Sequence, residues 1–530
     1  MIINNVRIYQ PYSHYHSDDI YHVRFEKGKI EEIRKGKTDE IGEHIIEANE
    51  RTIAPSFIDS HMHLLRYGLL KKELDLRHVD SWEMMKEEVA EFHSEMEEHD
   101  WISGKGFDDA KFDDIASYLT AKDLDQIHLN KKIFFLHQDG HECVVNDKVL
   151  DLLKEEENFK LEPDDFKETD DHGNWNGRFK DTAVHYIKRH FLDRTVEDAK
   201  LAIEKAIPHL LQFGITTVHT DDLNFIGSYD RLWRAYRELE EEGKLPITVF
   251  LHHYIFNEED LKRFIKEVDK RTGQGSTKVK VGAIKIFLDG TQRLHTAAMR
   301  FPYHDKPQTY GNCIYTQQQL NEMLQIAGSE NMQVAMHAIG DRAVEQALEA
   351  LEQNEAKTNQ LNHRIVHAQT LGPDLIEKLE RVKPYIETQP SFLLKEWNKK
   401  EKWAGKELAP YCDAFGTMQR RNIPFTLSSD CPIGELNPFE TIFAAVNRTD
   451  KHHQPEGGWM PKEKLSLDES YYAFTTTPVE LELTNDRKGK IEKGFPADFV
   501  LLSHHPHEVD AKELRHIEVI ETWIDGKRVY

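Results

Sequence analysis

Cysteine is scarce in this chain of 530 residues, and the four that occur, Cys143, Cys313, Cys412 and Cys431, lie far apart. The sequence has no Cys-x-x-Cys pair, which argues against a thiolate metal cage and against a disulfide framework. Scattered cysteines of this kind are typical of a reducing compartment. We therefore expect a cytoplasmic protein.

Long apolar runs and positive charge are also in short supply. No apolar stretch approaches the ~20 residues needed to span a bilayer, and the N-terminal sequence lacks the basic-then-apolar pattern of a signal peptide. The formal net charge is −25, and no long stripe of Lys and Arg offsets it. We expect neither a membrane anchor nor a nucleic-acid partner.

What the chain does have is a β-rich segment at each end. Short alternating stretches bounded by turn residues predict four strands within residues 1–52 and three more within residues 485–530. We predict that these two segments combine into one small β-sandwich domain.

Between them, residues 53–484 alternate strands with amphipathic helices, which is the pattern of a (β/α)8 barrel of the TIM type. An open doubly wound sheet is the alternative, but no Gly-x-Gly-x-x-Gly follows the first strand, which weakens its dinucleotide-binding form. The predicted barrel strands are Ile53–Asp59, Ile215–His219, Ile247–His252, Gly282–Leu288, Gln333–His337, Arg364–His367, Tyr385–Gln389 and Phe425–Ser429.

A long segment interrupts this rhythm after the first barrel strand. Residues 64–195 are far too many for a βα loop, and they include helical stretches of their own, such as Trp82–Glu98. We predict an inserted subdomain on the side where the first strand ends. In a barrel that side carries the active site, so the insert is expected to roof it.

Polar side chains that bind metals occur where several predicted barrel strands end. His61 and His63 are two residues apart, so in an extended strand both point to the same face. Each polar residue alone also fits a structural role, such as a core histidine with a satisfied hydrogen bond or a strand-end cap. Their combination on five strands favours one convergent site, formed by His61, His63, Lys285, His337, His367 and Asp430.

With these motifs the sequence resembles the amidohydrolase superfamily, and more narrowly its long-chain branch that includes N-substituted formamide deformylases. The resemblance covers nearly the whole chain. The stretches that carry it are Ala54–His63, Trp101–Phe107, Asp139–Asn146, Gly214–Thr220, Lys285–Gly290, His337–Asp341, His367–Gln369, Ser428–Asp430 and Gly489–Ala497.

The resemblance implies a role for each residue of the predicted site. His61 and His63 would bind the more buried metal, and His337 and His367 the second one. Lys285 would be carboxylated on its side-chain nitrogen and bridge the two metals; a mononuclear enzyme with an unmodified lysine is the alternative. Asp430 would bind the buried metal and handle the proton.

The chemistry of these residue types agrees with those roles. A carbamate forms only on a neutral amine, and a lysine in an apolar strand loses its proton readily. Imidazole and carboxylate ligands without thiolate favour zinc, while Mn, Co, Ni and Fe remain open. One or two divalent ions would supply a metal-activated hydroxide, since a bound water has its pKa lowered from ~15.7 toward ~7.

Four further residues are candidates for contact with the substrate: His141, His219, Asp289 and His295. A structural hydrogen bond is the competing interpretation for His141 and His219. His295 stands in Leu294–Ala297, where the branch usually has Ser-Arg-Thr-Ala. That departure leaves the substrate open without affecting the metal ligands. Gln369 and Gln389 could line the same pocket.

The sequence thus predicts a metal-dependent hydrolase that cleaves a carbon–nitrogen bond in a small amide: N-formyl, N-acyl or cyclic. A hydrolytic deaminase or an esterase on the same metal site is the alternative. A non-catalytic binding relative would usually have lost a ligand, and none is missing here. A homodimer is common among relatives, although no residue pattern predicts one.

Overall fold

The computed structural model describes residues 1–42, 44–70, 74–94, 101–128, 130–160, 162–191, 194–354, 360–484 and 486–530. The chain divides into two units. The first comprises Met1–Leu64, Glu204–Asp222 and Trp233–Tyr530, and the second comprises Leu65–Ile203 and Leu223–Leu232. The end of the predicted helix Trp82–Glu98 and the boundary at residue 485 fall outside the described residues.

The first unit contains an eight-stranded, all-parallel sheet in the order β19-β18-β17-β16-β15-β14-β13-β6. Its strands are β6 (Phe57–Met62), β13 (Ile215–Asp221), β14 (Thr248–Tyr254), β15 (Val279–Phe287), β16 (Val334–Ala338), β17 (Arg364–His367), β18 (Tyr385–Thr388) and β19 (Phe425–Leu427). Ser60 Oγ of β6 lies 2.8 Å from Thr426 Oγ1 of β19, so the first and last strands nearly close a barrel. The predicted TIM-type architecture is confirmed.

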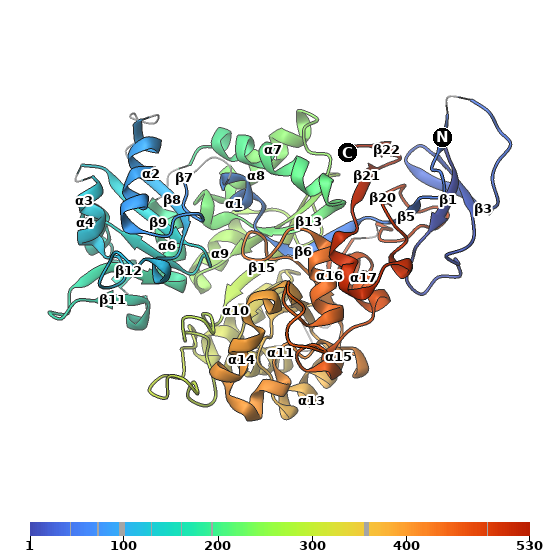
Figure 1. Cartoon of the computed structure of the whole chain (residues 1–530). Coiled ribbons are helices and arrows are strands. Elements are labelled where there is room, and N and C mark those ends of the chain that lie inside the picture. Colours follow the sequence, from blue (N-terminus) through green and yellow to red (C-terminus); the bar gives the residue numbers. More distant parts are fainter. Residues whose placement is uncertain are drawn as a thin grey trace. The chain divides into compact units, whose positions relative to one another are not determined.

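Helices alternate with these strands in the chain, and Figure 1 shows several of these helices in yellow and orange. Their starts follow from local sequence: Thr316 and Gln319 form a capping box at the start of α10, and Pro373 takes the first turn of α13. The helices are α7 (Val196–Gln212), α8 (Tyr229–Glu241), α9 (Glu258–Glu267), α10 (Gln317–Ser329), α11 (Asp341–Gln353), α13 (Pro373–Val382), α14 (Leu393–Leu408), α15 (Phe415–Arg420), α16 (Pro438–Asn447) and α17 (Leu467–Thr475).

Both termini of the chain join one mixed sheet in the same unit, as predicted (Figure 1). It runs β22-β21-β20-β5-β1-β2-β3, with β4 paired to β1, and its core includes Val23, Phe499 and Trp523. The strands are β1 (Ile2–Ile8), β2 (Tyr21–Glu26), β3 (Lys29–Lys35), β4 (Ile45–Glu47), β5 (Thr52–Pro55), β20 (Phe499–Leu502), β21 (Val519–Ile524) and β22 (Lys527–Arg528). Whether the sheet is a separate domain stays a prediction.

The predicted strand Ile53–Asp59 is wrong as a single element. β5 ends at Pro55 and pairs antiparallel with β20, whereas β6 begins at Phe57 and pairs parallel with β13. The break falls at Ser56, just after a proline that has no N–H to continue a ladder. This one apolar run therefore contributes a strand to each of two sheets.

The second unit has its own six-stranded sheet, in the order β11-β12-β10-β9-β8-β7. Its apolar core includes Leu76, Val89, Phe107 and Phe135, so the insertion after β6 is a folded body rather than a long loop. Its strands and helices are β7 (Leu74–Asp75), β8 (Trp101–Phe107), β9 (Lys132–His137), β10 (Glu142–Val145), β11 (Lys167–Thr169), β12 (Trp175–Lys180), α1 (Leu64–Leu69), α2 (Trp82–Ser94), α3 (Ala121–Ile127), α4 (Asp147–Glu155), α5 (Glu157–Lys160) and α6 (Asp181–Phe191). Among the described residues, no helix has both the length and the apolar character that a membrane crossing requires.

Candidate metal centre

The six predicted ligands all belong to the first unit, and they lie at the carboxyl ends of barrel strands. His61, His337 and His367 are in the last residues of β6, β16 and β17, Lys285 is two residues before the end of β15, and Asp430 follows β19. In a closed parallel barrel these strand ends form one face, where barrel enzymes carry their active sites.

Three of these side chains bring donor atoms together. Asp430 Oδ1 lies 3.2 Å from His63 Nε2 and 3.6 Å from His61 Nε2, and the three residues form a group able to hold a metal ion. A tetrahedral ion with ligand bonds of about 2.0–2.1 Å would space its donor atoms about 3.3 Å apart. The observed spacing therefore fits a divalent cation.

Backbone contacts fix these donors relative to one another. Asp430 N–H donates to His61 O at 2.8 Å, and His63 N–H donates to Cys431 O at 2.8 Å. Asp59, buried in β6, accepts from the backbone and hydroxyl of Ser429. Asp430 itself has a φ of +50°, a left-handed conformation that is uncommon for residues other than glycine. The turn after β19 is thus held to the end of β6 in a conformation that local preference alone would not select.

Three of the four histidines place Nδ1 beside an oxygen acceptor. His63 Nδ1 lies 2.7 Å from Asp221 O, His337 Nδ1 lies 3.1 Å from Asp289 Oδ1, and His367 Nδ1 lies 2.7 Å from Gln389 Oε1. An Nδ1–H that donates to oxygen leaves the Nε2 lone pair available, which is the usual arrangement of histidines that bind metals.

The rings of His337 and His367 lie near the group formed by His61, His63 and Asp430. Their centroids are 4.7 Å apart, and the His367 centroid is 5.7 Å from that of His61. Asp289, which orients His337, also accepts hydrogen bonds from the backbone N–H groups of Ala298, Ile339 and Gly340. Its described contacts thus hold the loops after β15 and β16. The suggested contact with substrate stays a prediction.

Lys285 is fully buried in β15, and its Nζ lies 3.3 Å from His61 Nε2. Burial lowers the pKa of its ammonium group, although nearby carboxylates, led by Asp221, oppose the shift. A buried amine with a lowered pKa spends more time in the neutral form, which is the form that reacts with CO2.

Burial also affects the charge states of His61 and Asp430. It holds the pKa of His61 well below its usual value, and the positive charge of Lys285 adds to the effect. Burial alone would raise the pKa of Asp430, but His63 and the other nearby cationic groups bring it below the usual value. The combination is a neutral imidazole beside a carboxylate, both able to donate lone pairs to a cation.

A second group able to hold a metal comprises His219, His252 and Glu387, all fully buried in the barrel. A positive charge already lies among these atoms. Arg364 Nη1 donates to Glu387 Oε1 at 2.7 Å and lies 2.8 Å from His219 Nδ1 and 3.5 Å from His252 Nε2. We interpret this group as a charge network around a guanidinium rather than as a metal site.

The predicted substrate contacts are distributed over both units. His219 belongs to the Arg364 network, and His295 Nε2 lies 3.0 Å from Asp305 Oδ1 in the first unit. His141 belongs to the second unit, where its Nδ1 lies 2.9 Å from Asp181 Oδ1. The contacts of His219, His295 and His141 with substrate stay predictions.

Sequence reasoning missed the residues that surround the ligands. Asp59, Arg364 and Glu387 lie within predicted strands but are not among the predicted site residues, although a fully buried charge requires a partner. One signal in the sequence was a charged residue inside a strand, as Asp59 is inside Phe57–Met62. That signal was used for Lys285 alone.

The fold and the site together define a barrel hydrolase with a candidate metal centre. The model of the amidohydrolase family matches residues 44–530, and the chain belongs to this family. YtcJ of Bacillus subtilis (strain 168) is 29% identical over 492 residues, which cover 92% of this chain and 90% of that protein.

Two other similar proteins carry descriptions of activity. The N-substituted formamide deformylase of Arthrobacter pascens is 23% identical over 499 residues, covering 91% of this chain and 89% of that enzyme. A solved structure described as an uncharacterized metal-dependent hydrolase from Pyrococcus horikoshii OT3 is 26% identical, covers 96% of this chain and 98% of its own, and superposes with a TM-score of 0.76.

Proposed function

We propose that the protein is a metal-dependent amidohydrolase that cleaves a carbon–nitrogen bond in a small amide: N-formyl, N-acyl or cyclic. The observation that carries this proposal is the convergence of His61 Nε2, His63 Nε2 and Asp430 Oδ1 at ligand spacing. The similarity to an enzyme described as a formamide deformylase supports the choice of a carbon–nitrogen bond.

In this proposal the ligands are His61, His63, Lys285, His337, His367 and Asp430, and zinc is the ion that their donor set favours. When bound, the ion would lower the pKa of a water ligand toward ~7 and polarise the substrate carbonyl. Lys285 would bind as its carbamate: the neutral amine adds CO2, a nitrogen–carbon bond forms, and one proton is released. Its full burial and lowered pKa support this modification.

Asp430 would move the proton. Its carboxylate accepts a proton from water as the nucleophile forms, and passes it to the nitrogen of the departing amine. Because the pKa of Asp430 is held below its usual value, its side chain is deprotonated at the start of the reaction and can accept this proton. The oxygens of Asp221, Asp289 and Gln389 would keep the histidine rings in place throughout.

The test is a hydrolysis screen with metal-loaded protein across N-formyl, N-acetyl, cyclic-imide, ester and amino-purine or amino-pyrimidine substrates. We expect one or two transition ions per chain, amide cleavage, and loss of both upon chelation. Turnover confined to esters or to ring amines would replace the proposal with the esterase or deaminase alternative.

Asp430→Asn separates the proposed proton role from folding. We expect turnover to fall by about 10²–10⁴-fold while the melting temperature stays close to that of the parent. Asp269→Asn is the matched control, because the Asp269 side chain is 87% exposed and pairs only with the adjacent Lys270 in the described structure. Full activity in Asp430→Asn would remove the proton role.

A further inference from the structure

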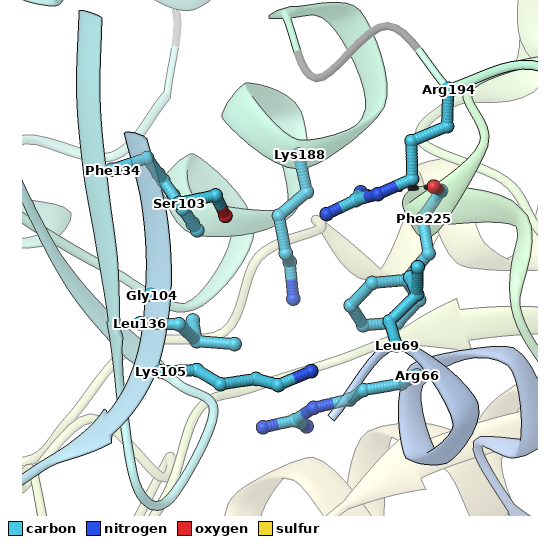
Figure 2. A pocket seen from close by; sticks show the side chains of 10 residues that line it. All are labelled: Arg66, Leu69, Ser103, Gly104, Lys105, Phe134, Leu136, Lys188, Arg194 and Phe225. Carbon is cyan, nitrogen blue, oxygen red and sulfur yellow. Dashed lines mark hydrogen bonds between the residues drawn. The ribbon is translucent and has the colours of Figure 1, made fainter. Parts of the chain in front are cut away.

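A pocket in the second unit and a chain of buried hydrogen bonds in the first unit both lie outside the set of proposed ligands. Arg66, Lys105, Lys188 and Arg194 are among the residues that line the pocket (Figure 2). Each of these cations interacts with other groups of the protein, so their charges do not require a bound anion. The chain of hydrogen bonds leads to His63.

His63 lies between two elements, because β6 ends at Met62 and α1 begins at Leu64. The pairing of β6 with β13 reaches Met62, which is opposite Thr220. The first N–H groups of a helix have no acceptor within the helix, so the N–H of Leu64 needs one from elsewhere. The position of His63 therefore depends on contacts other than the strand ladder.

The side chain of Thr220 provides that acceptor. Leu64 N–H donates to Thr220 Oγ1 at 2.8 Å, and the Thr220 hydroxyl donates in turn to Asp222 Oδ2 at 2.8 Å. The phenol of Tyr236, in α8, donates to the same Oδ2 at 2.6 Å. Thr220, Asp222 and Tyr236 are all fully buried. In such surroundings each hydrogen bond is strengthened by the low polarity around it and by its neighbours in the chain.

The Asp222 carboxylate is thereby connected to both sides of His63. His63 Nδ1 lies 2.7 Å from Asp221 O, and this carbonyl belongs to the planar peptide unit that Asp221 shares with Asp222. On the other side, the N–H of Leu64 belongs to the planar peptide unit that Leu64 shares with His63. One carboxylate thus helps to fix both the ring and the backbone of His63.

We propose that Tyr236 is a positioning residue for the candidate metal centre. Its phenol fixes the Asp222 carboxylate, which in turn holds His63 so that Nε2 stays beside Asp430. Tyr236 acts from α8 through a chain of hydrogen bonds, so its loss should loosen the site without removing a ligand. This inference rests on the proposed function, because it takes His63 as a ligand of the ion.

Tyr236→Phe tests the proposal, because it keeps the buried ring and removes the hydroxyl. Loss of a group that orients a metal ligand lowers metal affinity about 10–100-fold, and Tyr236 acts at one remove, so we expect a fall of about tenfold in the affinity for Zn²⁺. Competition with a chelator measures this affinity. The visible absorption of bound Co²⁺ should shift as well, since it depends on the geometry of the ligands.

Tyr471→Phe is the matched control. Tyr471 is also fully buried, and its hydroxyl donates to Pro55 O at 2.9 Å, just before the start of β6 and thus at the opposite end of that strand from the ligands. This variant loses one buried hydrogen bond of the same kind. It should bind Zn²⁺ with the affinity of the parent and give the same Co²⁺ spectrum.

Thr220 provides a second test, which also serves if Tyr236→Phe fails to fold. Thr220→Val keeps the shape of the side chain but cannot accept from Leu64 N–H, so it should lower the affinity for Zn²⁺ about tenfold. Thr220→Ser keeps the hydroxyl and should restore the affinity of the parent. Urea unfolding of the metal-free variants measures stability separately, and a merely structural role would change stability without changing the affinity for Zn²⁺.

Equal affinity for Zn²⁺ and equal Co²⁺ spectra in the parent, Tyr236→Phe and Thr220→Val would overturn the inference and leave the proposed function intact. A parent protein that binds no ion would instead refute the proposed function, and this inference with it.

Discussion

Arg364→Met is the substitution whose effect the structure allows us to work out most fully. Arg364 is completely buried in β17. Its Nε donates to Gln333 Oε1 at 2.7 Å, its Nη1 to Glu387 Oε1 at 2.7 Å, and its Nη2 to Leu481 O at 3.0 Å. Methionine fills much of the same volume but makes none of these bonds.

The expected cost follows from what is left behind. Removing one member of a buried ion pair costs about 3–5 kcal/mol, because the other charge stays in the interior. Burial already raises the pKa of the Glu387 carboxyl, and Arg364 is the group that most opposes that rise. Without Arg364 the carboxyl should bind a proton, which limits the loss at low pH. We therefore expect a larger loss at pH 8 than at pH 5.

The measurement is urea unfolding followed by fluorescence, with chelator in every sample so that bound metal does not contribute. Arg381→Met is the control: Arg381 is exposed and paired with Glu352, and an exposed pair contributes at most about 1 kcal/mol. The double variant Arg364→Met/Glu387→Gln should recover part of the loss. A loss below about 1 kcal/mol in Arg364→Met, or no recovery in the double variant, would refute the assignment of this network as a buried charge pair.

Three further predictions test other parts of the first unit. Burial raises the pKa of Asp222 from 3.8 to about 6; between those pH values the folded state keeps a proton that the unfolded state has lost, so stability falls by about 3 kcal/mol as pH rises. Asp222→Asn should therefore gain stability over the parent between pH 4 and pH 6 in urea titrations, and a constant difference would contradict this. Asp289→Asn should weaken metal retention about 10–100-fold in chelator competition, because it changes the acceptor of His337 Nδ1; unchanged retention would remove Asp289 from that role. Phe57→Ala should cost about 3–5 kcal/mol of unfolding free energy, since its fully buried ring packs edge-on against Phe439; a loss near 1 kcal/mol would mean that the cavity collapses.

Periodicity was enough to predict the barrel, because a parallel strand buried on both faces is an apolar run that alternates with amphipathic helices. It was not enough to divide Ile53–Asp59 between two sheets. The choice of partner for β5 and for β6 is made by β20 and β13, which lie far away in the chain. Pairing is a tertiary property that a local pattern does not contain.

The candidate site, too, has one part that the sequence predicts and another part that it does not. Its proposed ligands were predictable because histidines and an aspartate at strand ends are conspicuous, and their convergence follows from the barrel itself. The residues that orient them were not. Glu387 and Arg364 lie on neighbouring strands, and neither has a distinctive motif.

Glu387 connects the stability of the barrel with the candidate metal centre. One of its oxygens accepts from Arg364, and the other lies 3.6 Å from His61 Nδ1, which is longer than a hydrogen bond but close enough for charge to act in a dry interior. A negative charge there favours the tautomer with its proton on Nδ1, which leaves Nε2 toward Asp430. Arg364 keeps that charge in place. The guanidinium that fills the second metal-like group therefore helps to prepare the first group for its ion, and loss of Arg364 should weaken metal binding as well as the fold.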